Sequence, residues 1–187
     1  MRQLNAFTFT TLDGYYKDPE NDIQWHQHGP EEAEFSAASM AAGDTLLFGR
    51  VTFEMMEAFW PTPQAFENFP AVAEGMARAE KIVFSRAARQ TNWENARYAS
   101  EDLIDFVRRL KQTPGANLTL LGSGTILTQL ADHGLIDTYQ IMIDPVAIGD
   151  GRPIFAGLKQ RLDLKLLDSR RFQSGVVLLT YEPGARG

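Results

Sequence analysis

The sequence predicts an α/β protein with a mixed, mostly parallel sheet that is covered by helices on both faces. Up to about residue 145, short apolar stretches alternate with segments of helical pattern, an order typical of parallel sheets. The last quarter changes character, because residues 162–172 and 176–181 read as a β-hairpin around the turn at 173–175. That hairpin would add antiparallel strands to the sheet. No repeat or linker divides the chain, so we expect one domain over residues 1–187.

Five short stretches rich in leucine, β-branched or aromatic residues are expected to be the parallel strands. Residues that favour turns follow most of them, such as Asp13-Gly14 after the first, Gly49 after the second and Pro145 after the last. The predicted strands are residues 4–11, 45–48, 81–85, 118–121 and 138–143.

Five helices are expected between these strands, beginning near residues 30, 50, 70, 100 and 124. Pro30 followed by Glu31 and Glu32 is typical of a first helical turn, where proline is tolerated and acids interact well with the helix dipole. Ser100 is expected to cap the fourth helix, whose apolar residues recur at offsets of three and four. Residues 15–29 read as a long loop.

Composition excludes several classes of function. The 187 residues carry a net charge of −6, which gives no basic surface for nucleic acid or an anionic membrane. The absence of cysteine excludes disulfides, thiolate metal sites and a cysteine nucleophile. No stretch approaches the roughly 18 apolar residues of a membrane span, and we expect a cytoplasmic protein.

Anion-binding residues follow three of the predicted strands. The junctions are Gly49-Arg50-Val51-Thr52, Ser85-Arg86 and Gly122-Ser123-Gly124-Thr125. Glycines let the backbone approach a phosphate, and the free amides of a helix start attract its charge. Taken singly, each junction is equally well read as an ordinary turn or cap. Because ligands of parallel sheets bind at the carboxyl ends of the strands, the three together favour a ligand with several phosphates, such as NADPH.

Several segments resemble the dihydrofolate-reductase-like superfamily over nearly the whole chain. They are Leu12-Asp13-Gly14, residues 46–54, Leu121-Gly122-Ser123-Gly124 and Leu135-Ile136-Asp137. The run from Ile143 to Phe155 is more particular, and resembles the C-terminal reductase domain of the riboflavin-biosynthesis deaminase-reductase in its stand-alone form. The resemblance implies a three-layer α/β/α fold, a homodimer and NADPH laid across the strand ends.

Carried over by position, the resemblance assigns roles to these junctions. It implies that Gly49, Arg50 and Thr52 bind the adenosine-side phosphates, that Ser85 and Arg86 face the 2′-phosphate, and that Gly122, Ser123, Gly124 and Thr125 cover the pyrophosphate. It also places the Asp13-Gly14 loop beside the nicotinamide. Asp13 is then the nearest candidate proton donor, and partial burial there would raise its pKa.

The substrate side departs from dihydrofolate reductases. Counting back from Gly49 places Ala33 where those enzymes keep a carboxylate, with Glu32 and Glu34 beside it, and Glu34 is our candidate for the missing acid. Trp25 and Phe53 are candidates for an aromatic substrate site, although core packing is an equal reading for the phenylalanine. His26 and His28 are expected to be solvated loop residues, and no metal site is expected.

The sequence therefore leads to an NADPH-dependent reductase that delivers hydride to a small heterocyclic or ribosylamine substrate. Two alternatives stay open: a nucleotide-binding or ligand-sequestering protein without turnover, and a true dihydrofolate reductase. The partner is expected to be a small molecule in each case.

Overall fold

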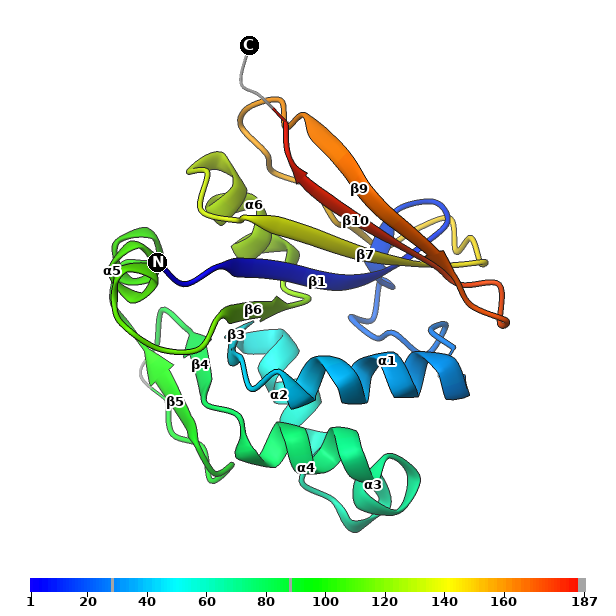
Figure 1. Cartoon of the computed structure of the whole chain (residues 1–187), viewed down its shortest axis with the longest axis horizontal. Helices are drawn as coiled ribbons and strands as arrows, with labels where there is room; N and C mark the ends of the chain where they lie inside the picture. The colour runs from blue at the N-terminus through cyan, green and yellow to red at the C-terminus, as the bar shows by residue number, and fades with distance from the viewer. Residues whose placement is uncertain (28, 88, 185–187) are drawn as a thin grey trace.

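A twisted sheet runs through the middle of the computed structural model, which describes residues 1–27, 29–87 and 89–184 (Figure 1). Within those ranges the large sheet has eight strands in the order β5-β4-β3-β6-β1-β7-β10-β9, and β2 pairs with β8 in a separate ribbon. The strands are β1 (Leu4–Thr11), β2 (Tyr15–Lys17), β3 (Thr45–Gly49), β4 (Lys81–Phe84), β5 (Ala96–Ala99), β6 (Leu118–Leu121), β7 (Thr138–Asp144), β8 (Arg152–Pro153), β9 (Leu164–Arg171) and β10 (Val177–Pro183).

The pairing confirms a mixed, mostly parallel sheet. Strands β5, β4, β3, β6, β1 and β7 are parallel to one another, whereas β10 runs antiparallel to both β7 and β9. Strand β1 lies between β6 and β7, so Phe7 is opposite Leu121 on one side and Gln140 on the other. This central place brings the first strand beside segments more than 100 residues away.

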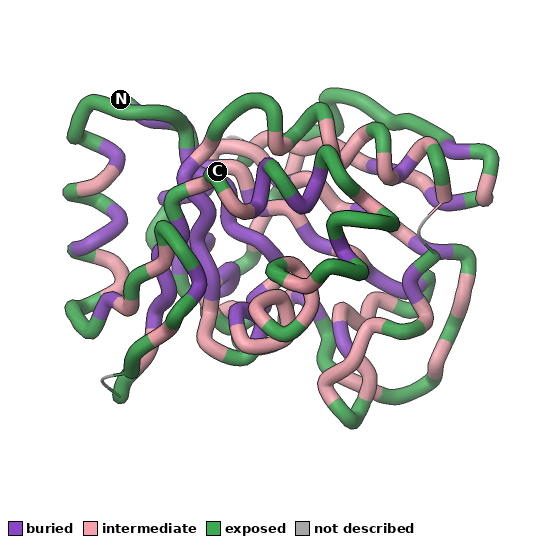
Figure 2. The backbone as a smooth tube through the Cα atoms, turned by 90° about the horizontal axis from the view of Figure 1, so that it is seen from below, coloured by how far each residue is buried: buried purple, intermediate pink, exposed green. Residues whose placement is uncertain are grey.

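Helices cover both faces of the sheet, which gives three layers. They are α1 (Pro30–Ala41), α2 (Arg50–Phe59), α3 (Pro63–Asn68), α4 (Pro70–Arg78), α5 (Leu103–Gln112) and α6 (Gly124–Asp132). Adjacent residues of β3 point to opposite faces: Leu47 joins the core under α5 and α6, whereas Leu46 and Phe48 join the core under α1, α2 and α4. Buried residues accordingly concentrate along the central strands, and exposed residues on the outer helices and loops (Figure 2).

The structure corrects the predicted elements in a few places. Asp102, not Ser100, caps α5, since its carboxylate accepts hydrogen bonds from the amides of Ile104 and Asp105. The expected loop at 15–29 contains β2, and the short elements α3 and β5 were not predicted. These elements are too short for a clear hydrophobic period, and the strands that pair with β2 and β5 lie elsewhere in the chain. No helix in the described ranges has the length and apolar character to span a membrane.

Candidate functional site

Two cavities lie against the parallel strands. One, of about 760 Å³, lies between β1 and helices α1, α2 and α4, and we call it the apolar cavity. The other, of about 980 Å³, lies at the ends of β3, β4 and β5 and the start of α6, and we call it the basic cavity. Tyr16, Lys17 and Thr52 line both. The two cavities are therefore neighbours that share a wall at the start of α2.

The basic cavity gathers the three junctions that the sequence singled out. Seven of the nine predicted cofactor residues line it: Gly49, Arg50, Thr52, Ser85, Arg86, Ser123 and Thr125. The amide of Gly49 donates a 2.8 Å hydrogen bond to the hydroxyl of Ser123, which ties the start of α2 to the start of α6. Neither helix start has a side-chain cap, so two sets of backbone amides face one rim.

Basic side chains outnumber acidic ones around this cavity. Lys17, Arg50, Arg86, Arg89 and Arg152 line it, against the acidic pair Glu101 and Asp102. Glu54 engages Arg50 at 2.7 Å and Arg89 at 3.2 Å. In the described part of the chain Arg86 makes no ion pair, which leaves its guanidinium available to an anion.

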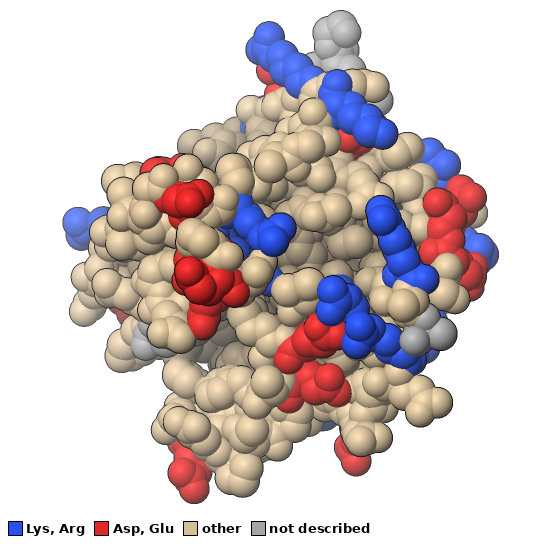
Figure 3. Space-filling model, turned by 180° about the vertical axis from the view of Figure 1, so that it is seen from behind, with Lys and Arg blue, Asp and Glu red and all other residues tan. Residues whose placement is uncertain are grey.

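The basic groups form local sites and not a continuous surface. Seen from behind, lysine and arginine side chains stand in separate groups beside acidic ones (Figure 3). Such an arrangement suits the few phosphates of a small ligand better than the regular backbone of a nucleic acid.

The remaining two predicted cofactor residues have other surroundings. Gly122, at φ +56°, lines the apolar cavity. Gly124 lines neither cavity, and a Cβ there would lie 2.6 Å from the Tyr16 ring. Burial raises the pKa of that phenol. Gly124 is thus needed for the close approach of Tyr16, which covers part of the helix start expected to bind pyrophosphate.

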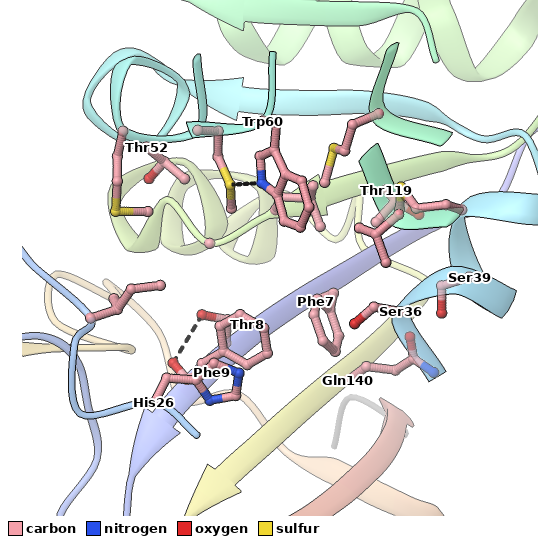
Figure 4. A pocket seen from close by; sticks show the side chains of 18 of the residues that line it. Phe7, Thr8, Phe9, His26, Ser36, Ser39, Thr52, Trp60, Thr119 and Gln140 are labelled. Carbon is pink, nitrogen blue, oxygen red and sulfur yellow. Dashed lines mark hydrogen bonds between the residues drawn. The ribbon is translucent and has the colours of Figure 1, made fainter. Parts of the chain in front are cut away.

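Aromatic and methionine side chains make up the middle of the apolar cavity. Trp60 and Phe7 point into it from opposite sides, as Figure 4 shows. Met56, which contacts the Trp60 indole N–H through its sulfur at 3.0 Å, and Phe59 extend the same wall. A space of this shape and lining suits a planar ring.

One end of the apolar cavity is polar. Ser36, Ser39, Thr119 and Gln140 lie together at that end in Figure 4. The Asn5 amide N–H donates a 2.7 Å hydrogen bond to the side-chain oxygen of Gln140. On the other side, the Thr119 hydroxyl donates to the carboxylate of Asp44 at 2.7 Å. These contacts could not be predicted from local sequence patterns, because 135 residues separate Asn5 from Gln140.

A buried histidine–aspartate pair lies at the opposite end. His26 lines the cavity with its ring stacked on Phe9, the ring centroids being 3.7 Å apart. Its Nδ1 lies 2.8 Å from the Asp144 carboxylate, which also accepts a hydrogen bond from the amide of Gln27. Both side chains are almost completely buried. His26 is therefore not the solvated loop residue that we expected.

Asp13, the predicted proton donor, lies outside both cavities. Its carboxylate accepts hydrogen bonds from the Thr11 hydroxyl and from the amides of Ile148 and Gly149. The Thr11 hydrogen bond, followed by those amides, lowers its pKa, the reverse of the expected direction. The structure assigns Asp13 to holding the loop after β7.

The three predicted substrate residues also lie outside the apolar cavity. Phe53 is fully buried in the core against Phe48, because the inward face of α2 packs on the sheet at that position. Glu34 is exposed, and Ala33 takes the place in the cavity wall. Trp25 packs edge-on to His26 without lining the cavity.

No group of three or more potential metal ligands was found among residues 1–27, 29–87 and 89–184. His28, which the sequence paired with His26, lies outside the described residues.

Comparison with known proteins gives a consistent family. The model of the RibD C-terminal domain matches residues 2–178. The uncharacterized protein YyaP of Bacillus subtilis (strain 168) is 29% identical over 171 residues, covering 91% of this chain and 89% of YyaP.

Two solved structures show the shared fold. A protein of Shewanella sp. PV-4, whose name links it to riboflavin biosynthesis, superposes with a TM-score of 0.78 at 22% identity, covering 99% of this chain and 100% of that one. Dihydrofolate reductase of Enterococcus faecalis, solved in complex with NADP(H) and RAB-propyl, superposes with a TM-score of 0.69 at 15% identity, covering 98% of this chain and 97% of that one. The chain thus has the dihydrofolate-reductase-like architecture.

Proposed function

The chain belongs to the RibD C-terminal domain family, and on that premise we propose that it is an NADPH-dependent reductase that delivers hydride to a small heterocyclic or ribosylamine substrate. One observation carries the proposal. A basic cavity with two uncapped helix starts and an apolar cavity lined by aromatic residues share Tyr16, Lys17 and Thr52. A dinucleotide needs the first environment for its phosphates, and its nicotinamide needs contact with the second.

The residues present fit NADPH. Arg86, which makes no ion pair with any described residue, offers its guanidinium for the 2′-phosphate, and the amides at the starts of α2 and α6 suit the pyrophosphate. Thr52 and Gly122 lie between this region and the apolar cavity, where a nicotinamide would have to enter. When bound, NADPH supplies the hydride, and the protein contributes orientation and exclusion of water.

His26 takes the role first considered for Asp13. Reduction of a polar double bond needs a proton as well as a hydride, and His26 is a titratable group in the wall of the apolar cavity. Asp144, 2.8 Å away, orients the imidazole. Stacking on Phe9 fixes the plane of the ring.

The two alternative functions predict different outcomes for NADPH binding and consumption. A ligand-sequestering protein would bind NADPH without consuming it. A true dihydrofolate reductase is disfavoured by Ala33, which brings a methyl group to the cavity wall where a carboxylate would be needed. The same test separates all three.

The test combines a binding titration with an absorbance assay. NADPH is titrated by its fluorescence, and its consumption is then followed with dihydrofolate and with a panel of pyrimidinones, pteridines and ribosylamines. We expect binding, consumption with a member of the panel and none with dihydrofolate. No binding, or binding without consumption across the panel, would contradict the proposal.

The expected homodimer has a candidate surface at the edge of the sheet. Strand β9 lies at that edge with Leu166 and Leu167 about half exposed. Pairing of two edges would cover these side chains. Light scattering after gel filtration measures the mass, and a monomer at micromolar concentration would exclude the dimer.

A further inference from the structure

The side chains that line the apolar cavity indicate the charge and shape of the substrate, which family membership alone does not specify. Its walls combine Phe7, Met56 and Trp60 with the carboxylates of Asp22 and Asp44. In the described part of the chain, Lys17 is the one lysine or arginine that lines it, and Lys17 also lines the basic cavity. A phosphate in the apolar cavity would lose its hydration to apolar walls and would be repelled by the two carboxylates. Binding of a phosphorylated substrate is therefore unfavourable there.

Lys17 is poorly suited to binding a substrate phosphate. Its side chain belongs to the β2–β8 ribbon, next to Arg152, and only 3% of the residue is exposed. Burial, and then the charge of Arg152, lower the pKa of its ammonium group. We therefore group Lys17 with the basic side chains of the basic cavity, which face the proposed cofactor.

The polar end of the cavity offers hydrogen bonds and no positive charge. Asn5 donates to the Gln140 oxygen, which leaves the Asn5 oxygen and the Gln140 amide nitrogen without partners among the described residues. If both amides were turned over, the same pair would still leave one free acceptor and one free donor. In either arrangement, a ligand that brings an N–H and a carbonyl to this end would satisfy the free acceptor and the free donor.

We propose that the apolar cavity selects an uncharged, phosphate-free planar heterocycle, whose adjacent N–H and carbonyl groups are bound by the Asn5–Gln140 pair at the end remote from His26. The inference rests on the proposed function and narrows it, because it excludes the phosphorylated ribosylamines. The ring lies between Phe7 and Trp60, and its reactive carbon faces the end where Thr52 and His26 lie (Figure 4). Gln140 determines specificity and takes no part in proton transfer.

The first arm of the test measures equilibrium binding to the wild-type protein saturated with NADP⁺. Lumazine, a fluorescent pteridinedione with the required edge, is titrated directly. Uridine and uridine 5′-monophosphate then compete with it, because they differ by the phosphate alone. We expect lumazine to bind, and uridine to compete at least ~10-fold better than its monophosphate. Equal or better competition by the monophosphate would overturn the proposal.

The second arm tests the recognition residues. Gln140→Leu should weaken lumazine about fivefold to tenfold, the usual effect of a lost neutral hydrogen bond. Gln112→Leu, at the exposed end of α5, is the matched control. Asp44→Asn should improve competition by uridine monophosphate relative to uridine. Unchanged lumazine affinity in Gln140→Leu, or an unchanged competition ratio in Asp44→Asn, would contradict the proposal.

Failure of this inference is distinguishable from failure of the proposed function. NADPH affinity is measured separately for each variant and is expected to stay at the wild-type value, which also shows that the variant is folded. Preference for the phosphorylated competitor together with normal NADPH binding and consumption would reject the inference alone. Loss of NADPH binding by the wild-type protein would reject the proposed function.

Discussion

The two cavities share a wall but are built in different ways. The basic cavity consists of backbone amides and arginines that follow three strands, and most of its residues belong to short contiguous motifs. The apolar cavity consists of side chains from β1, β7, α1, α2 and α4, which only the packing of these elements brings together. In the proposed function, the basic cavity binds the dinucleotide, whereas the apolar cavity selects and protonates the substrate.

The largest effect should come from His26→Gln. This substitution tests whether the proton is donated to the substrate in the apolar cavity. We expect the turnover of any reduced substrate to fall by about 100-fold or more, because the proton donor is lost, whereas NADPH affinity stays unchanged. Steady-state kinetics across pH measure it, with His133→Gln, an exposed residue after α6, as the control. Turnover within twofold of wild type would exclude His26 as the donor.

The second prediction concerns Lys81, which supports the α4 wall of the apolar cavity. Replacing it should alter the apolar cavity and leave the basic cavity unchanged. Its side chain is fully buried, and its ammonium group donates hydrogen bonds to the carbonyls of Met76 and Ala79 at the end of α4. Burial lowers the pKa of Lys81 from 10.5 to about 8. Between these values the unfolded chain binds a proton that the folded chain does not, so stability should rise with pH.

We expect this rise to be at most about 3 kcal/mol of unfolding free energy and to be absent in Lys81→Met. Urea denaturation at about pH 7 and about pH 10 measures it, with the exposed Lys159→Met as the control. Because Met76 lines the apolar cavity, Lys81→Met should also weaken lumazine more than NADPH. Parallel pH dependence in wild type and Lys81→Met would show that Lys81 does not cause the rise.

Arg86→Ala tests whether the basic cavity binds the 2′-phosphate of the cofactor. A guanidinium bound to the 2′-phosphate should be worth roughly 10-fold or somewhat more in affinity, and NADH lacks that phosphate. We expect NADPH to be weakened by this factor and NADH to be nearly unaffected in fluorescence titrations. Arg108→Ala, on the outer face of α5, is the control. Equal losses for both nucleotides would place Arg86 away from the 2′-phosphate.

The smallest effect should come from Asp13→Asn, because Asp13 belongs to neither cavity. Turnover and NADPH affinity should stay within about twofold of wild type. Its hydrogen bonds, with Thr11 first, hold the pKa below 3.8, so the stability that they contribute is present above that value and is lost as pH falls through the folded pKa. Acid denaturation should therefore be less steep in Asp13→Asn than in the exposed control Asp168→Asn. A large loss of turnover would return Asp13 to the mechanism.

The sequence by itself determined the layered α/β architecture and the three strand-end junctions for which we propose anion binding. Both depend on local signals: the alternation of apolar stretches fixes strands and helices, and glycines with arginines at strand ends mark where backbone amides are free. In a parallel sheet those ends meet at one edge whatever the details of packing, which is why Gly49 and Ser123 could be expected near each other.

Only the tertiary structure decided which side chains line the apolar cavity. His26 meets Asp144 across 118 residues, and Asn5 meets Gln140 across 135, because β1 is inserted between β6 and β7. The same packing turned Phe53 into the core and tied Asp13 to the loop after β7. Local periodicity carries no information about the order of strands in a sheet, and that order sets the contacts on which selectivity depends.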